Sequence, residues 1–188
     1  IVSGGANMTV SKKDVDDFLC SAKRGDLFLG QLEIPVETVG YALQVSKSKG
    51  MTTLLNPAPA DSTILPFLRY TDILLPNETE LSLLGGEEKL LEAGTQTLVV
   101  TLGGKGYKIV SKKKRTAFPC PSVKVVDTTA AGDTFCGALC TMLSKGKNLE
   151  ESCRFASVAA SLSCTRKGAS ASVPTLEEVL SFTKQILI

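Results

Sequence analysis

Along the first hundred residues, the hydrophobic positions follow two alternating patterns. Apolar residues recur at helical spacing within 11–23, where Ser11 can cap the first turn, and residues 35–49 predict a second helix. Short apolar runs predict buried strands instead. The expected strands are 26–32, 52–55, 72–75 and 97–101, with the end of an earlier strand at Ile1 and Val2. A short helix capped by Asn77 and reaching Leu84, then a further helical turn, separate the last two strands.

The pattern changes after residue 101. Residues 107–110 and 115–119 are typical of a hairpin, and 132–145 and 149–164 of two long helices. Both helices are rich in small residues, which predicts that they pack closely. Thr175 and Glu178 have the spacing of a capping box that opens a last helix.

The alternation of strands and helices up to Thr101 predicts βαβ units and a parallel sheet covered by helices. Because no linker or repeat interrupts the pattern, we expect a single domain over residues 1–188. Ligands of such sheets bind at the carboxyl ends of the strands. The loops of interest therefore lie at Glu33, 56–59, Asn77, 103–106 and 127–133.

Composition narrows the class of protein. With 188 residues, 43% of them hydrophobic, the chain can form one domain with a sizeable core. A formal net charge of +2 gives no electrostatic case for nucleic acid or an anionic membrane. No apolar run approaches a bilayer span, and the start lacks a secretory signal. Since no initiator Met is present, we expect a fragment or the ordered part of a longer protein.

The chain contains no His, which excludes catalytic triads built on imidazole and His-ligated zinc. Acid–base chemistry must then come from carboxylates, Lys, Tyr or Cys. The six cysteines form no C-x-x-C pair and predict buried thiols in a reducing compartment. The alternative is a redox-sensitive pair of Cys136 and Cys140, which are four residues apart.

The most informative stretch is VDTTAAGDTF at 126–135. Small residues lead into a helix near Gly132, so the first backbone amides can face outward and bind an anion such as phosphate. Asp133 lies beside this anion site, where a carboxylate would repel phosphate unless it accepted a proton from an attacking hydroxyl. This combination predicts phosphoryl transfer to an alcohol. In the alternative interpretation, Asp133 only favours the helix dipole.

The segment DTTAAGDTF at 127–135 resembles the second signature of the ribokinase-like (PfkB) carbohydrate kinases. QLE at 31–33, NPAPA at 56–60, PNETE at 76–80, TLG at 101–103 and TRKGA at 165–169 follow the order of the family's ribokinase branch. The resemblance covers essentially the whole chain. It implies a three-layer α-β-α fold with a mostly parallel central sheet, without the usual N-terminal strands, lid and sugar-binding glycine motif. We therefore expect these 188 residues alone to be poorly stable and nearly inactive.

The resemblance also implies roles for individual residues. Asp133 matches the base that deprotonates the sugar's primary hydroxyl, and Ala131, Gly132 and Asp133 match an anion hole of backbone amides. Glu33 matches a carboxylate that contacts the sugar. The residues expected at the nucleotide are Asn77, Thr101, Leu102, Gly103, Gly104, Lys105, Gly106, Gly132 and Ser157. Ser157 stands where many members carry His or Asn near the adenine, and Lys105 is either a phosphate contact or a solvated turn residue.

Two metal ions are implied as well. Glu80 would act on Mg²⁺ through water, with ATP. A monovalent cation, normally K⁺, would lie between two groups of oxygen atoms supplied by Asp127 and Thr129 on one side and Ser163, Arg166, Gly168 and Ser172 on the other. Carbonyl and hydroxyl oxygens suit such a weakly hydrated cation, which would stiffen the anion hole.

The function that follows is ATP-dependent phosphorylation of D-ribose at the 5-hydroxyl, giving D-ribose 5-phosphate. Two alternatives stay open: a kinase for deoxyribose or another small sugar, and a truncated nucleotide-binding chain without activity. The expected partners are ATP and a small sugar, with no nucleic acid and no membrane, and a homodimer could form in the full-length protein. The expected location is the cytoplasm, or the nucleus as well in a eukaryote. The basic run 112–115 is interpreted as a solvated hairpin tip.

Overall fold

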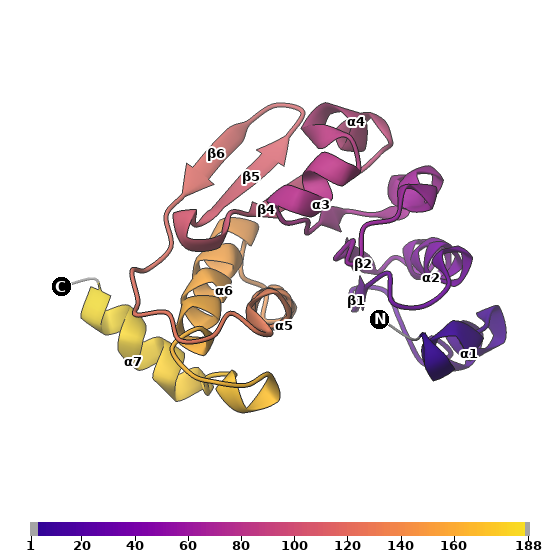
Figure 1. Cartoon of the computed structure of the whole chain (residues 1–188). Coiled ribbons are helices and arrows are strands. Elements are labelled where there is room, and N and C mark those ends of the chain that lie inside the picture. Colours follow the sequence, from indigo (N-terminus) through magenta and orange to yellow (C-terminus); the bar gives the residue numbers. More distant parts are fainter. Residues whose placement is uncertain (1–3, 187–188) are drawn as a thin grey trace. The chain divides into compact units, whose positions relative to one another are not determined.

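The computed structural model describes residues 4–186 (Figure 1). Its contacts group into two compact units. Unit 1 contains the chain up to Thr101 together with Lys108–Thr116, and unit 2 contains Leu102–Tyr107 and the chain from Ala117 onward. The strand end expected at Ile1 and Val2 lies outside the described residues. The single domain expected for residues 1–188 stays a prediction.

The sheet follows the order of the chain, from β1 to β6. The strands are β1 (Leu27–Gly30), β2 (Thr52–Leu55), β3 (Ile73–Leu74), β4 (Thr97–Thr101), β5 (Tyr107–Ser111) and β6 (Arg115–Phe118). The first four are parallel neighbours, with Leu54 opposite both Leu29 and Ile73. Leu54 and Leu98 are completely buried, as expected of strands covered on both faces. The predicted βαβ units and mostly parallel sheet are confirmed.

The helical elements of unit 1 are η1 (Gly5–Thr9), α1 (Lys12–Phe18), α2 (Val36–Ser48), η2 (Ser62–Tyr70), α3 (Glu78–Leu83) and α4 (Gly86–Glu92). The helix expected over 11–23 is longer than α1 in the structure. Leu19 enters the core, the chain then turns, and the carboxylate of Asp26 accepts the amide of Lys23 at 2.9 Å. Phe18 is 74% exposed although it is one of the apolar residues that recur at helical spacing within 11–23. The 3₁₀ segment η2, which contains Pro66, was not predicted.

Unit 2 contains η3 (Gly103–Lys105), α5 (Ala131–Ser144), α6 (Leu149–Ser163), η4 (Ser170–Ser172) and α7 (Leu176–Ile186). The small residues predicted the packing of α5 against α6 correctly. Leu139 of α5 and Ala156 of α6 are fully buried. The capping box is confirmed, because the amide of Thr175 donates to Glu178 at 2.7 Å and the amide of Glu178 donates to the Thr175 hydroxyl at 3.3 Å.

The cysteines differ from the expectation of uniformly buried thiols. All six are free, but only Cys136 and Cys153 are buried, and Cys20 is exposed. Cys20 follows the end of α1, where the chain turns away from the core, so its side chain is not covered. Cys136 and Cys140 form no disulfide.

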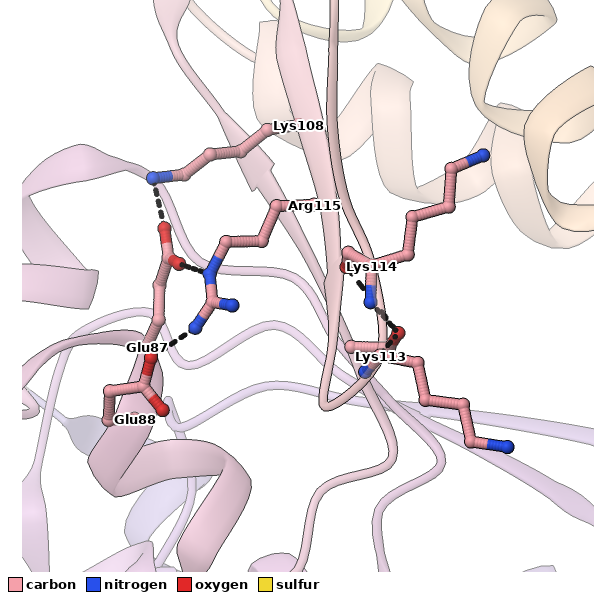
Figure 2. Close-up of polar contacts among 7 residues, drawn as sticks. Glu87, Glu88, Lys108, Lys113, Lys114 and Arg115 are labelled. Carbon is pink, nitrogen blue, oxygen red and sulfur yellow. Dashed lines mark hydrogen bonds and ion pairs between the residues drawn. The ribbon is translucent and has the colours of Figure 1, made fainter.

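Within unit 1, charged side chains join the hairpin of β5 and β6 to α4 (Figure 2). The carboxylate of Glu87 pairs with Lys108 and with Nε of Arg115, the latter at 3.1 Å, and Glu88 also pairs with Arg115. Lys112, Lys113 and Lys114 at the hairpin tip are exposed, which agrees with a solvated tip. Among the described residues, no helix is long and apolar enough to cross a membrane.

Candidate functional site

The N-terminal end of α5 is shaped by an unusual backbone conformation at Ala130. This residue has φ 60°, the left-handed conformation, and is the only non-glycine residue with positive φ in the described part of the chain. Its carbonyl accepts both the amide and the hydroxyl of Thr134, at 2.9 and 2.8 Å. The turn therefore brings the chain abruptly into the helix, and Asp133 lies in the first turn, at the positive end of the helix dipole.

The backbone in front of this helix is accessible at Gly132. A Cβ atom placed on Gly132 would meet no heavy atom within 4 Å. Amides in the first turn of a helix have no acceptor within the helix itself. The amide of Ala131, expected in the anion hole, donates to the carbonyl of Thr128 at 3.2 Å. It is therefore already engaged, and the open backbone lies at Gly132.

Asp133 is exposed and lines a cavity of about 340 Å³ within unit 2. The side chain is therefore not turned into the core. Most of the other lining residues are apolar or small and come from α5, α6, the segment before α7 and α7 itself; they include Ala138, Phe155, Ala159, Val173, Pro174 and Val179. An exposed carboxylate at the rim of such a cavity can receive a proton from a hydroxyl that enters it.

Asp127 joins the loop before α5 to the loop after α6. One carboxylate oxygen accepts the hydroxyl and amide of Thr129, at 2.7 and 3.0 Å, and the other accepts the amide of Gly168 at 3.0 Å. These hydrogen bonds, that from the Thr129 hydroxyl above all, lower the pKa of Asp127 from 3.8 to about 2. Two of the loops expected at a monovalent cation are thus brought together.

The remaining residues of the expected cation site lie in the same unit. Ser172 is buried and its hydroxyl donates to the Ala169 carbonyl at 2.7 Å, and the Ser163 hydroxyl donates to Ala160 at 2.9 Å. The Arg166 side chain pairs with Glu178, at 2.5 and 3.2 Å, which leaves its backbone carbonyl as the atom for a cation. Carbonyl and hydroxyl oxygens on two joined loops form a donor set that fits a weakly hydrated monovalent cation.

Glu33 lies in unit 1, in the loop after β1. Its side chain is exposed and lines a cavity of about 310 Å³, together with Asn7, Gln31 and Phe28. The preceding residue, Leu32, is buried and its amide donates to the carbonyl of Ala58 at 3.0 Å. The position of Glu33 therefore depends on the loop after β2.

Asn77 and Glu80 form reciprocal hydrogen bonds at the start of α3. The Glu80 carboxylate accepts the backbone amide of Asn77 at 2.9 Å and its side-chain amide at 2.8 Å, while the Asn77 carbonyl oxygen accepts the amide of Glu80 at 2.8 Å. Burial raises the pKa of Glu80 despite these hydrogen bonds. This capping box accounts for the N-x-x-E spacing, and the expected role of Glu80 with Mg²⁺ stays a prediction. Asn77 also bridges to Thr101, so two residues expected at the nucleotide are neighbours.

The loop 102–106 in unit 2 is closed by a hydrogen bond from the Leu102 amide to the Gly106 carbonyl at 2.8 Å. Gly103, Gly104 and Lys105 are exposed on it. Ser157, expected near the adenine, is 6% exposed on α6. Asn56 was not assigned a role from the sequence, although it contacts the ends of two neighbouring strands; only its position directly after a buried strand could have indicated it.

The sequence is similar to those of known proteins. The sequence signature described as pfkB family carbohydrate kinase matches residues 5–176. A ribokinase of Staphylococcus aureus is 39% identical over 191 residues, which cover 95% of this chain and 63% of the relative. A deoxyribokinase of Salmonella typhi is 31% identical, covering 95% of this chain and 62% of the relative. The chain thus spans less than two thirds of the length of these curated relatives.

Solved structures show the same similarity. A ribokinase from Thermotoga maritima has a TM-score of 0.84 and 39% identity, covering 98% of this chain and 64% of that chain. A ribokinase from Arabidopsis thaliana, solved with ribose and ATP, has a TM-score of 0.81 and 33% identity, also covering 98% and 64%. This likeness confirms the expected three-layer α/β fold class.

Proposed function

Because the chain belongs to the pfkB family of carbohydrate kinases, we propose that it acts as an ATP-dependent sugar kinase that converts D-ribose to D-ribose 5-phosphate. The observation that carries this proposal is the exposed Asp133 in the first turn of α5, beside the open backbone at Gly132 and at the rim of a cavity. A base next to an anion-binding helix mouth is what transfer of a phosphoryl group to an alcohol requires.

In the proposed reaction, the sugar's primary hydroxyl gives its proton to the Asp133 carboxylate as its oxygen attacks the γ-phosphorus. The bond from that phosphorus to the bridging oxygen of ATP breaks, and ADP leaves. Amides at Gly132 and Asp133 stabilise the charge on the transferred group. Glu33 binds sugar hydroxyls, while Asn77, Thr101 and the loop 102–106 bind the nucleotide. ATP carries Mg²⁺, which neutralises phosphate charge, and we place Glu80 near it through water.

A monovalent cation such as K⁺ would bind to oxygens of Asp127, Thr129, Ser163, Arg166, Gly168 and Ser172. When bound, it supplies fixed positive charge. Asp127 already ties Gly168 to Thr129, directly before the left-handed turn at Ala130, so an ion here would stiffen the mouth of α5. Equal turnover in K⁺ and in a large organic cation would contradict this role.

A second candidate substrate is deoxyribose, favoured by the similarity to a deoxyribokinase. The two sugars differ by one hydroxyl, so their ratio of kcat/KM at equal concentration identifies the preferred one. We place the protein in the cytoplasm, or also in the nucleus of a eukaryote, and allow a homodimer in the full-length protein.

The decisive test is Asp133→Asn in the full-length protein, assayed by ADP release with ribose and ATP. Loss of a general base should lower kcat by roughly 10²–10⁴-fold while ATP still raises the melting temperature. Glu151→Gln is the matched control, because Glu151 is an exposed acid in the first turn of α6 and tests the dipole contribution alone. Equal effects of the two variants would show that Asp133 acts only through its interaction with the helix dipole. Binding of ATP without any turnover by the unaltered full-length protein would favour a nucleotide-binding chain without activity.

A further inference from the structure

Asn56, the first residue after β2, connects the carboxyl ends of three parallel strands within unit 1. Its backbone amide donates to the carbonyl of Gly30 at the end of β1, at 2.9 Å. Its side-chain amide donates to the carbonyl of Leu75, just after β3, at 2.8 Å. Its side-chain oxygen faces Nε2 of Gln31 at 3.5 Å, the longest of the three contacts.

These contacts surround the loop that carries Glu33. Residues 31–34 form no helix or strand, and the amide of Leu32 bonds to Ala58, two residues beyond Asn56. The loop is thus tied to the chain after β2 on both sides of Gln31. Glu33 follows directly and is itself exposed, so these hydrogen bonds set where its carboxylate lies.

The segment after β3 is also held by hydrogen bonds that do not involve Asn56. The amide of Leu75 donates to Leu55 at 2.8 Å, Asn77 bridges to Thr101, and Asn77 and Glu80 cap α3 together. Losing the bond from Asn56 to Leu75 therefore leaves the Asn77 region with other hydrogen bonds. The Glu33 loop is held by the contacts of Asn56 to Gly30 and Gln31 and by the bond from the Leu32 amide to Ala58.

We propose that Asn56 is a positioning residue for sugar binding, which holds the Glu33 loop so that its carboxylate meets the hydroxyls of the sugar. This inference rests on the proposed function, in which Glu33 contacts the sugar. The role requires an amide, because one end must donate to the Leu75 carbonyl while the other accepts from Gln31. A carboxylate at position 56 could not donate to the Leu75 carbonyl, and repulsion between the two oxygens would turn it away, which would also move it from Nε2 of Gln31.

The test is Asn56→Asp in the full chain, with KM measured separately for ribose and for ATP. We expect the KM for ribose to rise about fivefold or more, the change that one ordinary hydrogen bond represents, while the KM for ATP stays within about twofold. Asn148→Ala is the control, because the Asn148 side chain caps α6 and its loss destabilises the fold without touching the Glu33 loop. Equal rises in both KM values would overturn the proposal.

A second measurement does not depend on activity. Hydrogen exchange of the Leu32 amide should become faster in Asn56→Asp and unchanged in Asn148→Ala. Unchanged exchange in Asn56→Asp would overturn the positioning role, whereas an unaltered chain that phosphorylates no sugar would contradict the proposed function alone. If Asn56→Asp does not fold, Gln31→Met replaces it, since it removes the donor that faces the Asn56 side-chain oxygen. The same acceleration at Leu32 is expected, and its absence would equally overturn the proposal.

Discussion

The carboxylate of Asp127 accepts a hydrogen bond from the backbone amide of Gly168 at 3.0 Å, across 41 residues of chain. Its other oxygen holds Thr129, directly before the left-handed residue Ala130. One side chain therefore fixes the loop after α6 and the entrance to α5 together. Asp127 therefore holds the N-terminal end of α5 in place.

This arrangement predicts a dependence of stability on pH. The pKa of Asp127 is lowered to about 2 from 3.8, so its ionised form is favoured in the folded state. Its contribution is fully present above about pH 4 and is lost as the pH falls towards 2. Melting temperatures of the unaltered chain and Asp127→Asn, measured from pH 7 to 2, should differ above about pH 4 and converge near pH 2. A difference that persists unchanged at pH 2 would contradict this assignment.

The loop 102–106 predicts a strict requirement for glycine at position 106. Gly106 has φ 101°, and a Cβ there would lie 2.0 Å from the carbonyl oxygen of Phe118 and 2.8 Å from the amide nitrogen of Cys120. Because both are backbone atoms, Gly106→Ala should lower the free energy of unfolding by about 3 kcal/mol or more.

Gly104 provides the matched control, since a Cβ there meets nothing within 4 Å and its φ is not in the left-handed region. Gly104→Ala should change the free energy of unfolding by less than about 0.5 kcal/mol. Urea denaturation of both variants measures the difference. Similar losses would show that the overlap at Gly106 relaxes at little cost.

Because the backbone at Gly132 is open, we expect a substitution there to lower activity without lowering stability. Gly132→Ala meets no neighbour and adds a better helix former, so the free energy of unfolding should stay the same or rise by up to about 1 kcal/mol. The added methyl group would nevertheless keep a phosphoryl group from the amides, and kcat for ribose should fall at least tenfold. Gly137→Ala, in the same helix and equally free of neighbours, is the benchmark for stability. Full activity of Gly132→Ala would contradict an anion site at this backbone.

The buried strands were the most predictable part of the fold. The runs 52–55 and 97–101 coincide with β2 and β4 because both are rich in Leu, Val and Thr and their central residues are buried. The end of α1 could not be predicted, because the turn after Leu19 depends on the carboxylate of Asp26 reaching back to Lys23. Similarly, η2 was missed because Pro66 lies inside it, although its buried residues Ile64 and Leu68 are four positions apart, as in a helix.

For the candidate site, the sequence predicted the place of Asp133 from the small residues before it. It could not predict that the Ala131 amide bonds to Thr128, because this depends on the left-handed φ of Ala130. The role of Asn56 depends on three strands ending at the same level, which the register of the sheet sets and a linear pattern does not contain.

The order of the strands from β1 to β4 has a consequence for how the chain is made. Each of these strands lies beside the one that precedes it in the sequence, so its partner has already left the ribosome when it emerges. No early strand must wait, unpaired, for a late one. We therefore expect this region to acquire its structure stepwise during synthesis, one strand after another.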